Sequence, residues 1–187
     1  FVKLTVKLSP KQGGKASLVS GIKWCIIYLK WDEVGEQKFS KVFMLIGEFT
    51  HTIDEKNRIS LPAKFRKEMG SDLVITPGLD NCLFIVTKKE WQKISEKLSG
   101  FSMLSSDNRS FNRFMFGGAT EVTVDSIGRL LLPDFLKERA GLKSKAALVG
   151  VQNRLEVWND KAWVAYKTKV EKQADALAEK LGGVGVI

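Results

Sequence analysis

Two short stretches of this 187-residue chain carry the same charged pattern, an aspartate followed four positions later by an arginine. Around that pair both stretches follow the order Thr, Ile or Val, Asp, three variable residues, Arg, Ile or Leu, one variable residue, Leu and Pro, over residues 52–62 and 123–133. An aspartate and an arginine at this spacing can pair across a tight turn. The arginine fork can also bind the phosphates or base edges of DNA. The available chemistry is therefore electrostatic recognition of an anion.

The residues alone leave two interpretations of this pattern open. In the first, Lys56, Arg58 and Arg129 present cations and forked donors to DNA. In the second, Asp54 and Asp125 close the two turns and pair with the arginines, as aspartates in turns commonly do. A catalytic pair formed by the two carboxylates is a weaker alternative, because no nucleophile or metal-binding set accompanies them.

Composition argues against an enzyme and favours a polyanionic partner. A single histidine, His51, and two distant cysteines, Cys25 and Cys82, disfavour metal sites, catalytic triads and disulfides. We therefore expect no catalysis, no metal and no cofactor. No apolar run approaches the roughly 20 residues of a membrane span, so we expect a cytoplasmic protein without a membrane partner. The net charge of +9 favours nucleic acid as the partner.

Residues 1–43 differ from the rest of the chain. They contain eight lysines, three acidic residues and no arginine, and their apolar residues follow no sustained period. The first methionine is Met44. We expect residues 1–43 to be a leader that is disordered or does not belong to the natural protein.

From Met44 onward the chain repeats itself at an offset of 71 to 72 residues, as a second pair of blocks around Trp91 and Trp163 also shows. The organisation we predict is a first repeat at 44–98, a linking segment at 99–114, a second repeat at 115–166 and a C-terminal helix and tail at 167–187. One repeat has too few strands for a stable sheet. The two repeats are therefore expected to pair around a shared core.

Each repeat predicts the same series of elements. A strand leads into the turn, a second strand forms a hairpin with the first, and a proline then opens a short helix. Asn57 and Gly128 occupy the turn position that suits a positive φ. The expected helices are 63–69, 88–98, 106–116, 134–140 and 161–181, and the later strands are 73–76, 83–86, 147–149 and 155–158.

Aromatic residues of the expected helix at 106–116 allow one further interpretation. Phe111, Phe114 and Phe116 alternate with Arg109 and Arg113, an arrangement that could stack nucleic-acid bases. Packing against a core or a second subunit is the preferred interpretation, because apolar residues at helical spacing usually face a core.

Taken together, these motifs resemble the MraZ family of bacterial transcriptional regulators. The resemblance runs from about Met44 to Tyr166 and rests on both turn blocks, Gly47-Glu48-Phe49, Ala63-Lys64-Phe65-Arg66 and the segment from Gly150 to Trp158. It implies an α+β fold in which two tandem AbrB-like, β-rich halves form a pseudo-twofold barrel with flanking helices. It also implies a ring-shaped homo-oligomer that binds short direct repeats in double-stranded DNA. Such a protein would be nucleoid-associated and would repress its own operon in the division and cell-wall gene cluster.

The resemblance also assigns roles to particular residues. The DNA-facing positions it implies are Lys56 and Arg58 in the first turn and Arg129 in the second. We add Asn57 and Gly128 as DNA-binding positions at the turn tips, and we expect Asp54, Pro62, Asp125 and Pro133 to shape the turns. Asn57 stands where the family often has glycine, and Ile127 occupies the position equivalent to Lys56. The two halves are therefore expected to contribute unequally. The alternative function is an AbrB-fold protein-interaction module of the antitoxin type.

The leader also constrains its own coding DNA. Trp31-Asp32 is encoded only by TGG followed by GAT or GAC, which fixes the sequence TGGGA. Val34-Gly35 permits another TGGG about ten nucleotides later, close to one turn of B-DNA. Since the resemblance implies regulators that bind G-rich direct repeats upstream of their own start, we hypothesise that the leader encodes the operator. A codon other than GTG for Val34 in the gene would remove the second repeat.

Overall fold

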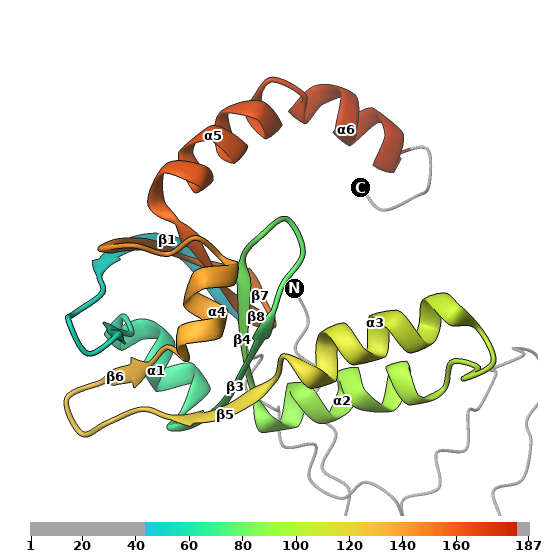
Figure 1. Cartoon of the computed structure of the whole chain (residues 1–187). Coiled ribbons are helices and arrows are strands. Elements are labelled where there is room, and N and C mark those ends of the chain that lie inside the picture. Colours follow the sequence, from blue (N-terminus) through green and yellow to red (C-terminus); the bar gives the residue numbers. More distant parts are fainter. Residues whose placement is uncertain (1–43, 183–187) are drawn as a thin grey trace, which may run out of the picture. The chain divides into compact units, whose positions relative to one another are not determined.

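The computed structural model describes residues 44–182, so the expected leader at 1–43 and the last five residues lie outside the described residues. Strands and helices alternate along the chain, and the predicted α+β class is confirmed (Figure 1). The strands are β1 (Leu45–Thr52), β2 (Arg58–Ser60), β3 (Asp72–Pro77), β4 (Leu83–Thr87), β5 (Thr120–Thr123), β6 (Arg129–Leu131), β7 (Lys145–Gln152) and β8 (Arg154–Asn159). The helices are α1 (Ala63–Met69), α2 (Lys88–Ser99), α3 (Ser106–Gly117), α4 (Asp134–Arg139), α5 (Asp160–Glu171) and α6 (Ala174–Gly182).

The two repeats interleave their strands in one antiparallel sheet. Its order is β1-β7-β8-β4-β3-β5, and β2 pairs with β6 in a separate two-stranded ribbon. The counterparts in the two repeats are β1 and β5, β3 and β7, and β4 and β8. Exchanging the members of each pair gives the same strand order read from the opposite edge, so the sheet is unchanged. A pseudo-twofold axis therefore passes between β8 and β4. Only the β3–β4 and β7–β8 pairs lie within one repeat, so each repeat depends on the other for the rest of its hydrogen bonds.

The predicted hairpin around each turn is wrong for most of its length. Outside the first turn itself, one isolated bridge joins Ile53, directly after β1, to Ile59 of β2. Beyond it, β1 pairs with β7 in the sheet and β2 pairs with β6 in the ribbon. The reason is the shared core: the strands before and after the turn belong to two different layers around it, and each takes its partner from the other repeat.

The strands described between residues 44 and 182 form an open sheet and a ribbon, and their hydrogen bonds do not close a barrel. β1 pairs only with β7, and β5 pairs only with β3, which leaves both at the edges of the sheet. The ribbon contributes to the same apolar core as the sheet. The pseudo-twofold arrangement is thus present, and the second layer is the ribbon.

The core contains equivalent residues from both repeats. Ile59 and Leu130 face each other in the ribbon, while Phe65 on α1 and Leu136 on α4 occupy equivalent helical positions 71 residues apart. All four side chains are at most 1% exposed. Burying one such side chain stabilises a fold by about 1.5–3 kcal/mol. A core of this composition joins the two repeats into one folding unit.

The short helix α1 spans its predicted range, and α4 begins as predicted and ends one residue earlier, at Arg139. Each follows a proline, Pro62 or Pro133, which is accepted at a helix start because no intrahelical acceptor awaits its missing N–H. The chain leaves them through Gly70 (φ 75°) and Gly141 (φ 57°). These left-handed conformations suit glycine because it has no Cβ.

The single C-terminal helix predicted at 161–181 is wrong, because the chain forms two helices there. The break lies at Lys172 and Gln173, where the Gln173 amide donates to the Val170 carbonyl three residues back. The first half of α5 contacts the sheet through Trp163 and Tyr166, but neither α5 nor α6 contains a fully buried residue, so packing does not hold the junction between them straight. Among the helices within residues 44–182, none combines the length and apolar character needed to cross a membrane.

Candidate nucleic-acid interface

The two Asp-to-Arg turns lie next to each other, although 71 residues separate them in sequence. They extend from the ribbon of β2 and β6, in which Ser60 is the partner of Arg129. The Arg129 Nη1 atom lies 3.8 Å from Asp54 Oδ2, which is an ion pair between the turns. The fold therefore combines the two charged patterns into one surface.

Both turns have the same internal hydrogen bonds. In the first, Asp54 Oδ1 accepts from the Lys56 and Arg58 amides at 2.9 and 2.8 Å, and Oδ2 accepts from Arg58 Nε at 2.8 Å. In the second, Asp125 Oδ1 accepts from the Ile127 and Arg129 amides at 3.1 and 2.8 Å, and Oδ2 accepts from Arg129 Nε at 2.9 Å. The aspartates order the turns and fix the direction of both guanidinium groups.

These contacts keep both aspartates charged. The backbone amide of Arg58 lowers the pKa of Asp54, and the Arg58 side chain and the Lys56 amide lower it further. The Arg129 amide and side chain, with the Ile127 amide, act on the pKa of Asp125 in the same way. The Arg58 and Arg129 side chains remain 31% and 27% exposed. Each arginine thus presents a fixed edge to solvent while its charge is partly neutralised by its aspartate.

Asn57 and Gly128 have the positive φ that the sequence predicts, 55° and 88°. Their carbonyl oxygens accept hydrogen bonds from the amides of Leu132 and Leu61 at 2.8 and 2.9 Å. Each of these amides comes from the other repeat, directly before the proline that opens α4 or α1. The tip of each turn is thereby fixed to the opposite half.

A helix of the other repeat also contacts each tip. Arg66 on α1 donates from Nη1 to the Ile127 carbonyl at 3.3 Å, and a Cβ atom on Gly128 would lie 1.8 Å from that nitrogen. Lys137 on α4 donates to Asn57 Oδ1. Positions 66 and 137 are equivalent at the repeat offset of 71. Sequence reasoning missed these contacts because the partners belong to different repeats, and the shared offset was the signal that could have found them.

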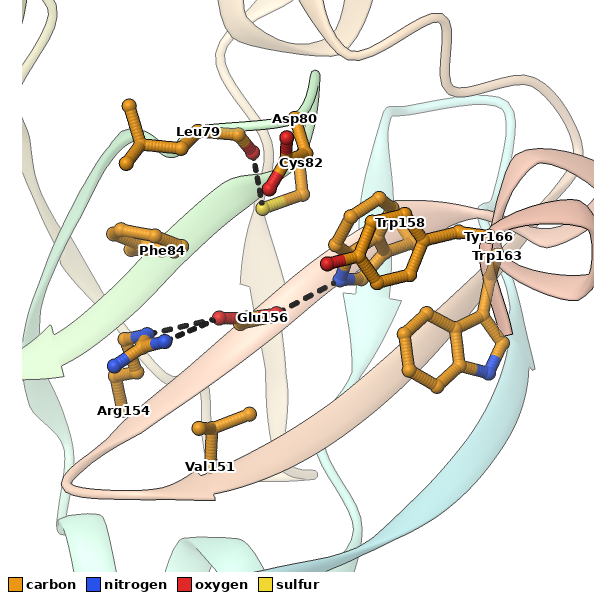
Figure 2. A pocket seen from close by; sticks show the side chains of 10 residues that line it. All are labelled: Leu79, Asp80, Cys82, Phe84, Val151, Arg154, Glu156, Trp158, Trp163 and Tyr166. Atoms are coloured by element: carbon orange, nitrogen blue, oxygen red, sulfur yellow. Dashed lines mark hydrogen bonds and ion pairs between the residues drawn. The ribbon is translucent and has the colours of Figure 1, made fainter. Parts of the chain in front are cut away.

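A second candidate site is a cavity of about 320 Å³ between β4, β8 and α5 (Figure 2). Glu156, only 8% exposed, accepts from Arg154 Nε at 2.9 Å and from Trp158 Nε1 at 3.0 Å. Arg154 also lies over the Phe84 ring, 4.8 Å from its centre. The buried carboxylate of Glu156 is therefore neutralised by Arg154 inside the cavity.

The aromatic wall of this cavity attaches α5 to the sheet. The Trp158 ring lies 5.4 Å from that of Trp163 and 4.9 Å from that of Tyr166. Burial raises the pKa of the Cys82 thiol to about 12, with Glu156 and Asp80 contributing. The thiol therefore remains protonated at neutral pH, and the thiolate that nucleophilic or metal-binding chemistry requires is not formed.

The remaining candidates are not brought to the turns. Phe111 and Phe116 on α3 are 41% and 36% exposed, while Arg139 covers the Phe114 ring at 4.4 Å. The preferred packing of these aromatic residues against a core is therefore only partial within the chain. Among the residues from 44 to 182, no three His, Cys, Asp or Glu side chains are grouped so as to hold a metal ion.

Comparison with known proteins gives matches across both repeats. Residues 44–114 and 115–182 each match the family described as MraZ protein, which the same description calls antitoxin-like. The "Transcriptional regulator MraZ" of Caldicellulosiruptor bescii is 43% identical over 143 residues, which cover 76% of this chain and 100% of that protein. The protein of the same name from Moorella thermoacetica is 45% identical over 138 residues, covering 74% of this chain and 96% of the relative.

Proposed function

Because the chain belongs to the MraZ family, with both repeats matching it, we propose that the protein is a sequence-specific DNA-binding transcriptional regulator. The names of its relatives support regulation of transcription. The observation that carries the proposal is the pair of adjacent turns, each with an arginine held in a fixed direction by an aspartate. Fixed guanidinium forks suit phosphate oxygens and base edges, because little side-chain entropy is lost on binding.

The proposed contact residues are Lys56, Asn57 and Arg58 in the first turn and Gly128 and Arg129 in the second. At Asn57 and Gly128 the contact is made by backbone and turn shape. The aspartates Asp54 and Asp125 hold the arginines, while Pro62 and Pro133 start the helices that support the turns from the opposite half.

One chain offers a small contact area, so the proposed working form is a ring-shaped homo-oligomer bound to short direct repeats. Several weak contacts on one DNA molecule then combine through a high effective concentration. Binding beside the promoter of its own operon, in the division and cell-wall gene cluster, would repress transcription. The protein would act in the cytoplasm, at the nucleoid.

The test is binding of the full chain to a labelled duplex that carries two TGGG repeats ten base pairs apart, compared with a scrambled duplex. We expect the double variant Arg58→Ala with Arg129→Ala to lose at least tenfold in affinity, since each good base or phosphate contact is worth about 1–3 kcal/mol. The matched control is Lys89→Ala with Lys97→Ala, which removes the same charge from exposed positions on α2. The oligomeric state should be unchanged in both variants, and the arginine variant should stay folded at the assay temperature, with only a small fall in its unfolding temperature from the lost pairs with Asp54 and Asp125.

Equal binding by the arginine variant and the wild type would remove the turns from the proposal. Absence of binding to either duplex, together with stoichiometric co-purification of an unrelated protein, would favour the antitoxin-type interaction module. That alternative fits the antitoxin-like description of the family. Duplication of the basic turn favours DNA.

A further inference from the structure

Neither turn carries a net positive charge by itself. The first contains Asp54, Glu55, Lys56 and Arg58, and the second contains Asp125 and Arg129, so charges cancel in each. Both arginines are already paired with carboxylates at 2.8–2.9 Å. Because binding to DNA depends strongly on cations near phosphate, each turn needs one further cation without an acidic partner.

In the first turn that cation is Lys56. It is exposed, and among the described residues no carboxylate lies within ion-pair distance of its ammonium group. The second turn has Ile127 at the same position, and this side chain is 64% exposed. An apolar side chain cannot attract a phosphate, so within its own repeat the second turn lacks this contact.

Arg66 brings a guanidinium group to this position from the other repeat. Its Nη1 donates to the carbonyl of Ile127 itself at 3.3 Å. Its Nε is buried without a hydrogen-bond partner, and none of the carboxylates in the described part of the chain forms an ion pair with it. Arg66 therefore differs from Arg58 and Arg129, which are held by their own aspartates.

The equivalent residue of the second repeat, Lys137, has a different environment. It donates to Asn57 Oδ1, and the same Asn57 side chain donates to the Asp134 carboxylate. The helices differ in the same sense. α1 contains three basic residues and one acidic residue, whereas α4 contains two of each. Positive charge is thus concentrated on the helix that supports the second turn.

We propose that Arg66 is a phosphate-binding residue that supplies, from the first repeat, the cation that the second turn lacks at Ile127. This inference rests on the proposed function in DNA binding. It assigns Lys56 and Arg66 the same role in the two turns, and it assigns Lys137 a purely structural one.

The test measures the affinity of the full chain for the TGGG duplex as a function of salt. The slope of log K against log salt is negative, and its magnitude decreases by about 0.9 for each phosphate contact that is removed. Each lost contact also weakens binding roughly tenfold at about 0.1 M salt, and a complex with several subunits on the DNA loses one such contact per subunit. We expect this loss in Arg66→Gln and in Lys56→Gln. The matched control Lys137→Gln should keep the wild-type slope, and Arg66→Lys should retain most of it.

A further variant separates charge from structure. Ile127→Lys restores a lysine to the second turn, and in an Arg66→Gln background it should recover the lost slope. Recovery supports the proposal even where Arg66→Gln lowers the unfolding temperature. The proposal would be overturned if folded Arg66→Gln kept the wild-type slope. It would also be overturned if Arg66→Gln and Lys137→Gln reduced the slope equally. If the wild type binds no DNA, the proposed function itself fails.

Discussion

The two turns share one backbone but obtain their supporting contacts in different ways. In the first turn the Asn57 side chain fills the space below α4 and bonds to Lys137 and Asp134. In the second, Gly128 has no side chain, and Arg66 occupies the space instead. A positive φ at the tip and a carbonyl contact to the other repeat are thus compatible with two residue pairs, Asn57 with Lys137 and Gly128 with Arg66. A substitution in either turn has to be judged together with its partner in the other repeat.

The largest effects are expected where the two halves are alike, at the helix residues that enter the common core. We expect Phe65→Ala to destabilise the protein by about 3–5 kcal/mol and Leu136→Ala by about 2–5 kcal/mol, because each leaves a cavity in a fully buried site. Urea unfolding followed by tryptophan fluorescence and by far-UV circular dichroism measures both losses.

Since the sheet interleaves the repeats, both probes should report one coincident transition in the wild type and in each variant. The control is Val164→Ala on α5, a side chain that is 63% exposed, and it should change stability little. Two separate transitions, with only one displaced by Phe65→Ala, would show that the halves fold independently.

An intermediate effect is expected where the halves differ, at the tips of the turns. Gly128→Ala places a Cβ on a residue at φ 88°, and the backbone strain alone should lower the free energy of unfolding by about 1–2 kcal/mol. The added Cβ also pushes against Arg66. Asn57→Gly relieves a positive φ while giving up two side-chain hydrogen bonds, and these contributions offset each other in part.

The measurement is the urea midpoint of each variant, and Gly141→Ala is a control at a glycine with a φ of 57° and no neighbour within 4 Å of the added Cβ. Gly128→Ala should be more destabilising than Gly141→Ala if contact with Arg66 adds to the strain. Equal losses at the two glycines would mean that Arg66 moves aside without cost.

The smallest effect concerns acid stability and distinguishes the two aspartates. The folded state lowers the pKa of Asp54 and Asp125, so each contributes stability above its unfolded pKa of about 3.9, and this is lost as pH falls through the lower folded value. Asp54→Asn and Asp125→Asn should therefore make the protein less stable than the wild type at pH 7, and their stability should approach that of the wild type in acid. Asp54→Asn should have the larger effect, because Asp54 also faces Arg129.

Unfolding temperatures from pH 7 down to about pH 2 measure this dependence, because the loss occurs below the unfolded pKa, and Glu55→Gln removes one negative charge from the same turn as a control. If the difference between Asp54→Asn and the wild type does not change with pH, the aspartate supports the turn through its shape and hydrogen bonds and not through its charge.

Local features of the site could be predicted from the sequence because they depend on neighbouring residues. A positive φ at Asn57 and Gly128 follows from the conformational tolerance of these residue types, and the start of α1 after Pro62 follows from the lack of a proline N–H. The pairing of Asp54 with Arg58 follows from a spacing of four across a turn.

Contacts between the repeats could not be predicted in the same way. The sequence shows a repeat, but strands of similar composition can pair within one copy or between copies, and the pairing of β1 with β7 instead of β2 depends on how both copies enclose a single core. The break between α5 and α6 also escaped prediction, because helical periodicity does not reveal whether a helix has a surface to pack on.

The sequence by itself determined the two turns, their charges and the helices that follow them, since short-range sterics and hydrogen bonding act within a few residues. Only the tertiary structure decided that the turns lie side by side and that Arg66 reaches Ile127, while Lys137 is held by Asn57. The physical reason is that a shared apolar core brings together residues about 60 to 80 positions apart, and local interactions carry no information about that encounter.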